Sequence, residues 1–342
     1  MRHKTFFWFF LPTGMAMLLF IAMPIVSVVI QSVFAPHEAV LREVENCVPL
    51  VGCTTETTMD HEATRALREA APLGRFVGFD IFLDRGHLAV AEVKEAWTAS
   101  SNWVDFSNRI FNLPLYRALS FTLTFTFVVT PLLIILGMMI ALAVNSLHRH
   151  LRGLMIFFSL LPMIVTPLIG SLILFWMVDS RGIVGSALVA IAGDPNFSLK
   201  ASTGLTWVML IVYGVWHAAP FAFVVFYAGL QTLPQDQIES AMIDGATRWQ
   251  RVRYVVIPHL MPLMTFVALI QLMDNFRVFE PIVGFNSSAH ATSLSWIIFN
   301  DLGGETRQFS AASASSVLTI IGVAILLSPV LVRTWRDFQR KT

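Results

Sequence analysis

Charge is scarce in this sequence of 342 residues, of which only 13% are charged and 56% are hydrophobic. Soluble domains carry about 25% charged residues, and the mean hydropathy of this chain is +0.68. We therefore predict an integral membrane protein that is surrounded by the lipid bilayer. The 23 basic and 22 acidic residues leave a net charge of +1, which argues against nucleic acid as a partner.

Sequence features that carry catalysis are also missing. No G-x-x-x-x-G-K-[ST] pattern occurs, so the chain is not predicted to hydrolyse ATP by a P-loop. Serine, histidine and aspartate residues are scattered among predicted opposite sides of the membrane, which is not the pattern of an active site. His217 has no second histidine or cysteine at ligand spacing. We predict that the chain is not an enzyme and has no metal or cofactor of its own.

Long apolar runs dominate what is present. A helix needs about 20 apolar residues to cross a bilayer, and six runs meet this length, which predicts an all-α polytopic membrane protein. Short basic flanks mark the cytoplasmic side. Arg2 and Lys4 precede the first run and four basic residues lie in 333–342, so both termini are predicted to be cytoplasmic. The predicted spans are Phe6–Phe34, Ala118–Leu147, Leu154–Val178 with kinks at Pro162 and Pro167, Leu205–Leu230, one from near Leu260 to near Phe285, and Phe309–Val332.

A polar segment, residues 35–117, separates the first two spans and is predicted to be a small insertion on the outer side of the membrane. It contains both cysteines of the chain, Cys47 and Cys53. The outer side is an oxidising compartment, and the two cysteines are close enough in sequence to form a disulfide. Two free thiols are the alternative.

The polar segment 231–262, between the fourth and fifth spans, has signals of a helical hairpin. Pro234 can begin a helix because a first-turn residue needs no N–H donor. Gly245 can end that helix in the left-handed conformation, which glycine adopts at little cost. Thr247 can cap a second helix, which is predicted to run until Pro258. We therefore expect a short hairpin at the membrane surface.

This hairpin resembles the EAA loop of ABC-importer permeases. Glu239-Ser240-Ala241, then Asp244-Gly245-Ala246 and then Ile257-Pro258 follow the family's order, with Ser240 in place of the second motif residue. Residues 228–234 are similar to the carbohydrate branch, the maltose and glycerol-phosphate type. The likeness covers roughly residues 100–330 and implies a type I ABC-importer permease fold.

The resemblance implies a permease subunit of a binding-protein-dependent importer in the bacterial inner membrane, working by alternating access. Its implied partners are a second permease, two ATPase subunits that bind ATP and Mg, and a periplasmic solute-binding protein. The implied substrate is a carbohydrate or polyol. The residues implied to couple the chain to the ATPase are Glu239, Ala241, Met242, Asp244 and Gly245.

The resemblance also points to residues for the substrate. In the family, the helix after the EAA loop supplies polar side chains, and these positions fall on Gln271, Asp274 and Asn275. Hydrogen bonding between helices is the alternative role for such polar groups. Asp274 favours a neutral, hydroxyl-rich ligand, whereas Arg277 favours an anionic one, and the sequence does not rank them.

Aromatic candidates lie in the fourth span. In the family, an aromatic residue directly after a proline lines the sugar path, and Phe221 follows Pro220 here. Pro220 is expected to open the helix backbone beside a cavity. Trp216 is a second aromatic candidate, because rings stack against the apolar face of a pyranose. Plain helix packing is the alternative for both rings.

The predicted organisation is a first span with its N-terminus (1–34), the outer insertion (35–117), a five-helix core (118–332) and a cytoplasmic tail (333–342). Two other function classes compete with a permease. A receptor or scaffold would use the hairpin to bind a partner without transport. A channel would show polar periodicity in several spans, whereas polarity here is concentrated in the fifth.

Overall fold

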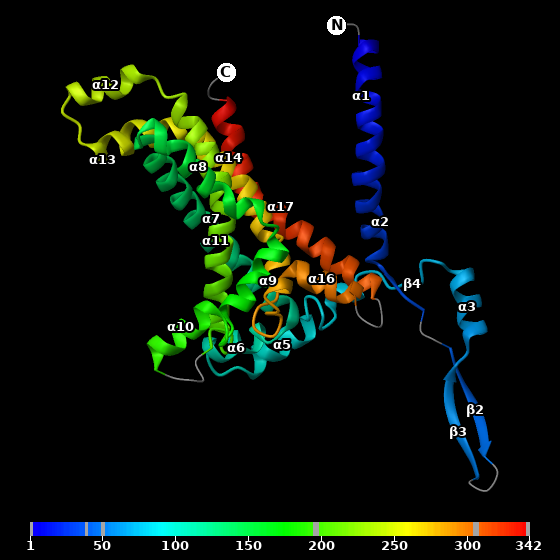
Figure 1. Cartoon of the computed structure of the whole chain (residues 1–342). Helices are drawn as coiled ribbons and strands as arrows, with labels where there is room; N and C mark the ends of the chain where they lie inside the picture. Colours follow the sequence, from blue (N-terminus) through cyan, green and yellow to red (C-terminus); the bar gives the residue numbers. More distant parts are fainter. Residues whose placement is uncertain (1–2, 38–39, 49–51, 194–197, 304–307, 340–342) are drawn as a thin grey trace. The chain divides into compact units, whose positions relative to one another are not determined.

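The computed structural model describes residues 3–37, 40–48, 52–193, 198–303 and 308–339. Within these ranges six helices are long and apolar enough to cross a membrane, which confirms the predicted number of spans. The chain divides into two compact units, Met1–Tyr116 with Ile297–Ile321 and Arg117–Trp296 with Gly322–Thr342. Figure 1 labels most of the helices and strands of both units.

The first span is a continuous helix made of α1 (His3–Met17), a π-helical turn (Leu18–Ala22) and α2 (Met23–Gln31). From Phe6 to Ile30 the described side chains are mostly exposed and none is buried. An apolar helix exposed on all sides requires lipid or another protein chain around it. This segment therefore has the surface of a membrane-spanning helix.

The outer insertion contains strands as well as helices. β2 (Leu41–Val48) pairs with β3 (Gly52–Met59) in an antiparallel two-stranded sheet, and β1 (Phe34–Ala35) pairs with β4 (Arg75–Phe76). Threonines are frequent in β3, and β-branched residues favour strands. The insertion continues with α3 (His61–Ala70), α4 (Asp80–Leu83), α5 (Val90–Ala99) and α6 (Trp103–Phe111).

Cys47 and Cys53 are direct partners in the β2–β3 ladder. Opposite residues of an antiparallel pair have Cα atoms about 4.5–5.5 Å apart, which lies within the disulfide range of about 4.4–6.8 Å. The disulfide stays a prediction, and this backbone register favours it. We expect mass spectrometry without reductant to find the linked peptide, and loss of the bridge to cost roughly 2–3 kcal/mol locally. Two free thiols in freshly purified protein would contradict the prediction.

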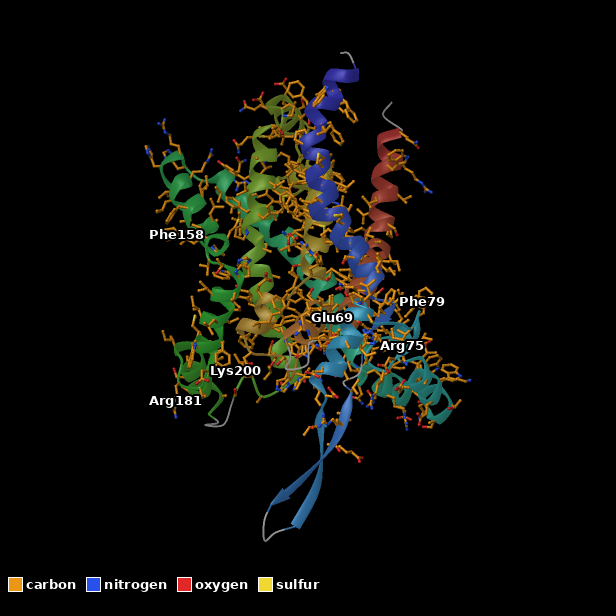
Figure 2. All side chains as sticks on the ribbon, turned by 90° about the vertical axis from the view of Figure 1, so that its right-hand side faces the viewer. Glu69, Arg75, Phe79, Phe158, Arg181 and Lys200 are labelled. Carbon is orange, nitrogen blue, oxygen red and sulfur yellow. The ribbon has the colours of Figure 1, made fainter. Side chains whose placement is uncertain are left out.

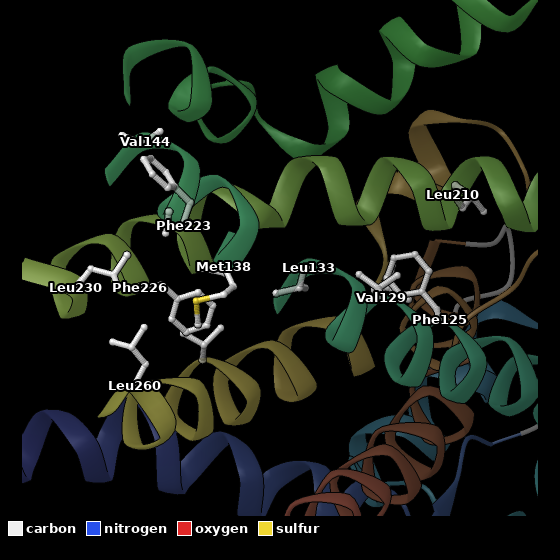
Figure 3. Close-up of a cluster of buried hydrophobic side chains, with 14 of the residues drawn as sticks. Phe125, Val129, Leu133, Met138, Val144, Leu210, Phe223, Phe226, Leu230 and Leu260 are labelled. Carbon is white, nitrogen blue, oxygen red and sulfur yellow. The ribbon is translucent and has the colours of Figure 1, made fainter. Parts of the chain in front are cut away.

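The core of the second unit forms where α7 (Pro114–Ser146), α11 (Thr203–Gln231) and α14 (Ile257–Phe276) contribute buried side chains to one cluster. α7 and α11 approach closely at Gly137, where an added Cβ would lie 2.6 Å from the Cβ of Ala222. Small residues allow such close helix packing in membranes. Figure 3 shows part of the cluster, including Phe125, Val129, Leu133, Phe223, Phe226 and Leu260.

The third span is broken rather than kinked. α8 (Arg149–Ile164) is followed by two extended residues, Val165 and Thr166, after which α9 (Pro167–Val178) begins. The break has a local cause, because a proline disfavours the α-helical conformation of the residue before it. The prediction of one kinked helix over Leu154–Val178 is therefore wrong.

Helix α10 (Ile183–Ala192) follows α9 after a short turn, and the apolar helical segment extends from Pro167 to Ala192. Lys200 holds this turn: its Nζ lies 2.9 Å from Asp179 Oδ2 and 3.6 Å from the centroid of the Phe175 ring. Lys200 is labelled near this end of the second unit in Figure 2.

The fifth span begins and ends earlier than predicted. α13 (Arg248–Arg251), a π-helical turn (Val252–Val256) and α14 form one continuous helix, so Pro258 does not end a helix. In the π turn, the Ile257 N–H bonds the Val252 carbonyl. Pro258, which has no N–H, thus follows the point where the hydrogen-bond pattern already changes. The span ends at Phe276 rather than near Phe285. The remaining helices are α15 (Glu280–Gly284), α16 (Leu294–Gly303) and α17 (Phe309–Gln339).

Candidate functional site

The polar hairpin begins with α12 (Gln235–Ile243), which ends as the sequence predicts. Gly245 has a φ of +75°, and its N–H bonds the Met242 carbonyl at 3.0 Å. The Ala246 N–H bonds the Ala241 carbonyl at 2.9 Å. These two bonds form a Schellman motif, in which a left-handed residue satisfies the last carbonyls of a helix. The predicted role of Gly245 as a helix terminator is confirmed.

The second helix of the hairpin begins with a capping box. The Gln250 N–H donates to Thr247 Oγ1 at 3.3 Å, and the Thr247 N–H donates to Gln250 Oε1 at 2.7 Å. Two orphan donors at the helix start are thereby satisfied. Thr247 is therefore the cap that the sequence predicts. Both ends of the short loop that joins α12 to α13 are thus fixed locally (Figure 1).

The predicted coupling residues are distributed over two faces of α12. Ala241 and Asp244 line a groove of 670 Å³ between α12 and the start of the fifth span, whose other lining residues include Tyr254 and His259. Glu239 and Met242 are exposed and do not line this groove. The hairpin thus presents a carboxylate and a thioether outward.

Two exposed apolar side chains of this hairpin escaped the sequence analysis. Ile243 is 86% exposed and Trp249 is 68% exposed. Exposed aromatic and aliphatic side chains on a polar segment are typical of a surface that binds another protein. The available signal was the presence of a Trp and an Ile within an otherwise polar stretch.

A second candidate site is a cavity of 560 Å³ among the spans of the second unit. Its size is within the range of small-molecule sites, about 300–1,000 Å³. The structure brings four of the predicted substrate residues to this cavity: Phe221 from α11 and Gln271, Asp274 and Asn275 from α14.

Trp216 does not line the same cavity. It is 47% exposed and lies in an apolar hollow of 380 Å³ with residues of α7 and α11, among them Met139 and Val212. Trp216 and Phe221 are five residues apart on a helix, so their side chains leave it in different directions. Its placement separates it from the polar groups proposed to hold the substrate.

Two polar side chains of α14 are already engaged within the chain, and a third is buried. Asn275 is buried, and its Nδ2 donates to Thr130 Oγ1 of α7 at 3.0 Å. Gln271 is buried as well. Asp274 is exposed to the cavity, and its Oδ1 accepts a hydrogen bond from the Arg277 guanidinium at 3.0 Å. The amide oxygen of Asn275 and the second Asp274 oxygen remain as acceptors for a ligand.

Tyr213 and His217 also line the cavity, and the sequence pattern pointed to neither of them. The Tyr213 hydroxyl donates to the Pro167 carbonyl at 2.8 Å, and His217 Nε2 donates to the Val165 carbonyl at 3.0 Å. Backbone carbonyls at a helix break must find partners inside a membrane. These two side chains of α11 therefore join the α8–α9 break to the cavity wall.

Pro220 lies inside α11, which continues from Thr203 to Gln231, so the helix does not break at this proline. The opened backbone lies instead at Val165 and Thr166, opposite α11. The sequence signals for this opened backbone were a pair of prolines in the third apolar run and a Tyr-x-x-x-His pair in the fourth.

The described part of the chain is mostly helical, with six helices long and apolar enough to cross a membrane, a polar cavity in the second unit and an exposed helical hairpin. This is the build of a membrane transport protein. The chain belongs to the family described as binding-protein-dependent transport system inner membrane component, whose model matches residues 133–336. The sequence-based assignment to the ABC-importer permeases is thus confirmed. The family consists of transport components and not of enzymes.

Several curated proteins are similar to this chain. The trehalose/maltose transport system permease of Thermococcus litoralis is 29% identical over 205 residues, which are 58% of this chain and 68% of that protein. The galactooligosaccharides permease of Bacillus subtilis is 27% identical, over 70% of this chain and 60% of its own length. The sn-glycerol-3-phosphate permease of Yersinia pestis is 27% identical, over 66% and 79%.

Solved structures share the fold. A chain of a bacterial ABC transporter for the acidic polysaccharide alginate superposes with a TM-score of 0.67 at 20% identity, covering 98% of this chain and 96% of that one. A chain from the alginate transporter in complex with its periplasmic protein gives 0.58 at 22% identity, covering 74% and 88%. The type I ABC-importer permease fold is thereby confirmed.

Proposed function

We propose that this chain is one of two permease subunits of an importer that moves a carbohydrate or polyol into a bacterial cell. Two separate ATPase subunits bind ATP and Mg on the cytoplasmic side, where both termini of the chain also lie. A periplasmic binding protein delivers the solute from the other side. The names of the similar permeases, which include trehalose/maltose, galactooligosaccharides and lactose systems, support this substrate class.

One observation carries this proposal further than the family alone. The helix from Arg248 to Phe276 is continuous over 29 residues, or about 43 Å at 1.5 Å per residue. Its first turn is fixed to the hairpin by the Thr247 capping box, and its last turns carry Gln271 and Asn275 to the cavity. A single continuous helix therefore connects the proposed ATPase contact with the proposed substrate site.

This connection gives alternating access a mechanical basis. Closure of the ATPase subunits moves α12, and the groove and capping box transmit that motion to the start of the fifth span. Movement of this helix then shifts Gln271, Asp274 and Asn275 relative to α11. The side chains of α11 that form the opposite wall of the cavity are Phe221, Tyr213 and His217. The cavity thereby changes the side of the membrane to which it opens, while its polar groups on α14 remain together.

Glu239→Lys should release the ATPase or uncouple it from transport. Glu239 is exposed on α12, and charge reversal replaces its charge-assisted hydrogen bonds to the partner with repulsion. We expect the permease to insert normally, with uptake of labelled maltose, lactose and galactooligosaccharide lost together. The measurement is co-purification of the ATPase alongside uptake in cells.

The matched control is Glu69→Lys, which reverses an exposed carboxylate of α3 outside the hairpin. This variant should transport normally. If Glu239→Lys keeps both ATPase binding and parental uptake, α12 is not a coupling helix. If none of the three sugars is taken up by the parent system, the proposed substrate class is wrong.

A further inference from the structure

Negatively charged residues outnumber positively charged ones around the substrate cavity. Among the described lining residues three are charged: Asp274, Arg277 and Glu280. Arg277 Nη2 lies 3.0 Å from Asp274 Oδ1, so these two charges compensate each other. In the described part of the chain, Glu280 has no cation within ion-pair distance. One uncompensated carboxylate therefore faces the cavity.

The position of Glu280 is fixed by its helix. Glu280 is the first residue of α15, which packs against α9 so closely that a Cβ on Gly284 would lie 2.0 Å from Ser171 Oγ. The Ser171 hydroxyl, which donates to the Leu168 carbonyl at 2.9 Å, also lies within 3.3 Å of the Glu280 carbonyl oxygen. The backbone of Glu280 thus has little freedom to carry its carboxylate away from the cavity.

An anionic solute has two disadvantages in such a cavity. It approaches the Glu280 carboxylate, and like charges repel most strongly where water is largely displaced. The Arg277 guanidinium keeps free N–H donors, but it attracts an anion less than an unpaired cation would, because Asp274 compensates part of its charge. A protonated amine has the opposite balance, because Glu280 offers it an unpaired acceptor. A neutral sugar depends on the hydrogen bonds of Asn275 and Asp274.

We infer that this cavity prefers amine-bearing and neutral sugars to acidic ones, and that Glu280 is the residue that sets this preference. The inference rests on the proposed function, since it assumes that a carbohydrate occupies the cavity. It also separates this chain from the alginate transporter that shares its fold, whose substrate is an acidic polysaccharide.

The test measures sugar binding to the complete complex with its partner subunits in lipid nanodiscs, by saturation-transfer NMR. The probes are a glucosamine disaccharide with protonated amines, maltose, and a galacturonic acid disaccharide. We expect the amine-bearing probe to bind roughly tenfold more tightly than the acidic one. Glu280→Gln should bring these two affinities to within about threefold, and Glu280→Lys should reverse their order. Glu69→Gln, at an exposed carboxylate outside the cavity, should leave the ratio unchanged.

Maltose serves as the internal standard for folding, because its affinity should be nearly the same in all variants. Equal affinities for the amine-bearing and acidic probes in the parent complex overturn the inference, and so does a ratio that Glu280→Gln leaves unchanged. In both cases maltose binding stays intact, so the proposed function survives. If none of the three probes binds the parent complex, the carbohydrate function fails and the inference fails with it.

Discussion

Gly245→Val should abolish uptake and detach the ATPase, whereas Gly193→Val should leave both nearly unchanged. The two glycines have the same local conformation, with φ of +75° at Gly245 and +67° at Gly193, and each follows the end of a helix. At both positions an added Cβ meets no atom of the residues that the structure describes within 4 Å. The left-handed backbone therefore costs a valine about 1–2 kcal/mol at either site.

The difference in uptake and ATPase binding between the two variants isolates the effect of the contact with the ATPase from that of backbone strain. Gly245 lies in the hairpin proposed to enter the ATPase, whereas Gly193 closes α10, far along the chain from it. Any loss beyond the shared backbone cost must come from a surface that the chain itself does not supply. Co-purification of the ATPase and uptake of labelled sugar measure this difference. Equal effects of the two substitutions would reduce Gly245 to a structural residue.

Features set by neighbours in sequence were predictable. Gly245 and Thr247 follow capping rules that depend on a few adjacent residues, and the structure has both caps in place. The number of spans was predictable for a similar reason, since length and apolar composition suffice to count them, although the bounds of the third and fifth were not. The presence of Asn275 and Phe221 at one cavity needed the family resemblance, because nothing local relates α11 to α14.

Features set by contacts between distant segments were not predictable. The break before Pro167 has a local cause, but the partner of the freed Val165 carbonyl is His217, 52 residues later in the chain. Pro258 was read as a helix end because a lone proline usually interrupts the hydrogen-bond ladder, but the preceding π turn absorbs it.

His217→Leu should destabilise the unliganded protein and lower uptake, and His217→Gln should restore much of both. The Val165 carbonyl lies before the first turn of α9, where no helical N–H is available to it. Leucine fills the space but donates nothing, so the carbonyl stays unsatisfied at a cost of about 1–3 kcal/mol. Glutamine keeps an N–H donor on a side chain of similar reach.

A role in structure and a role in substrate binding predict different readouts for His217, which also lines the cavity. If His217 holds the helix break, the thermal unfolding temperature of the purified complex falls in His217→Leu without any sugar present.

Tyr213→Phe should lower the unfolding temperature less than His217→Leu does, because the Pro167 carbonyl lies within α9 and can also accept a helical N–H. Tyr116→Phe, which removes a comparable hydroxyl bond to the Leu88 carbonyl in the other unit, controls for the loss of a tyrosine hydroxyl and should leave uptake unchanged. A His217→Leu complex that unfolds at the parental temperature but binds sugar poorly would assign His217 to the substrate instead of the break.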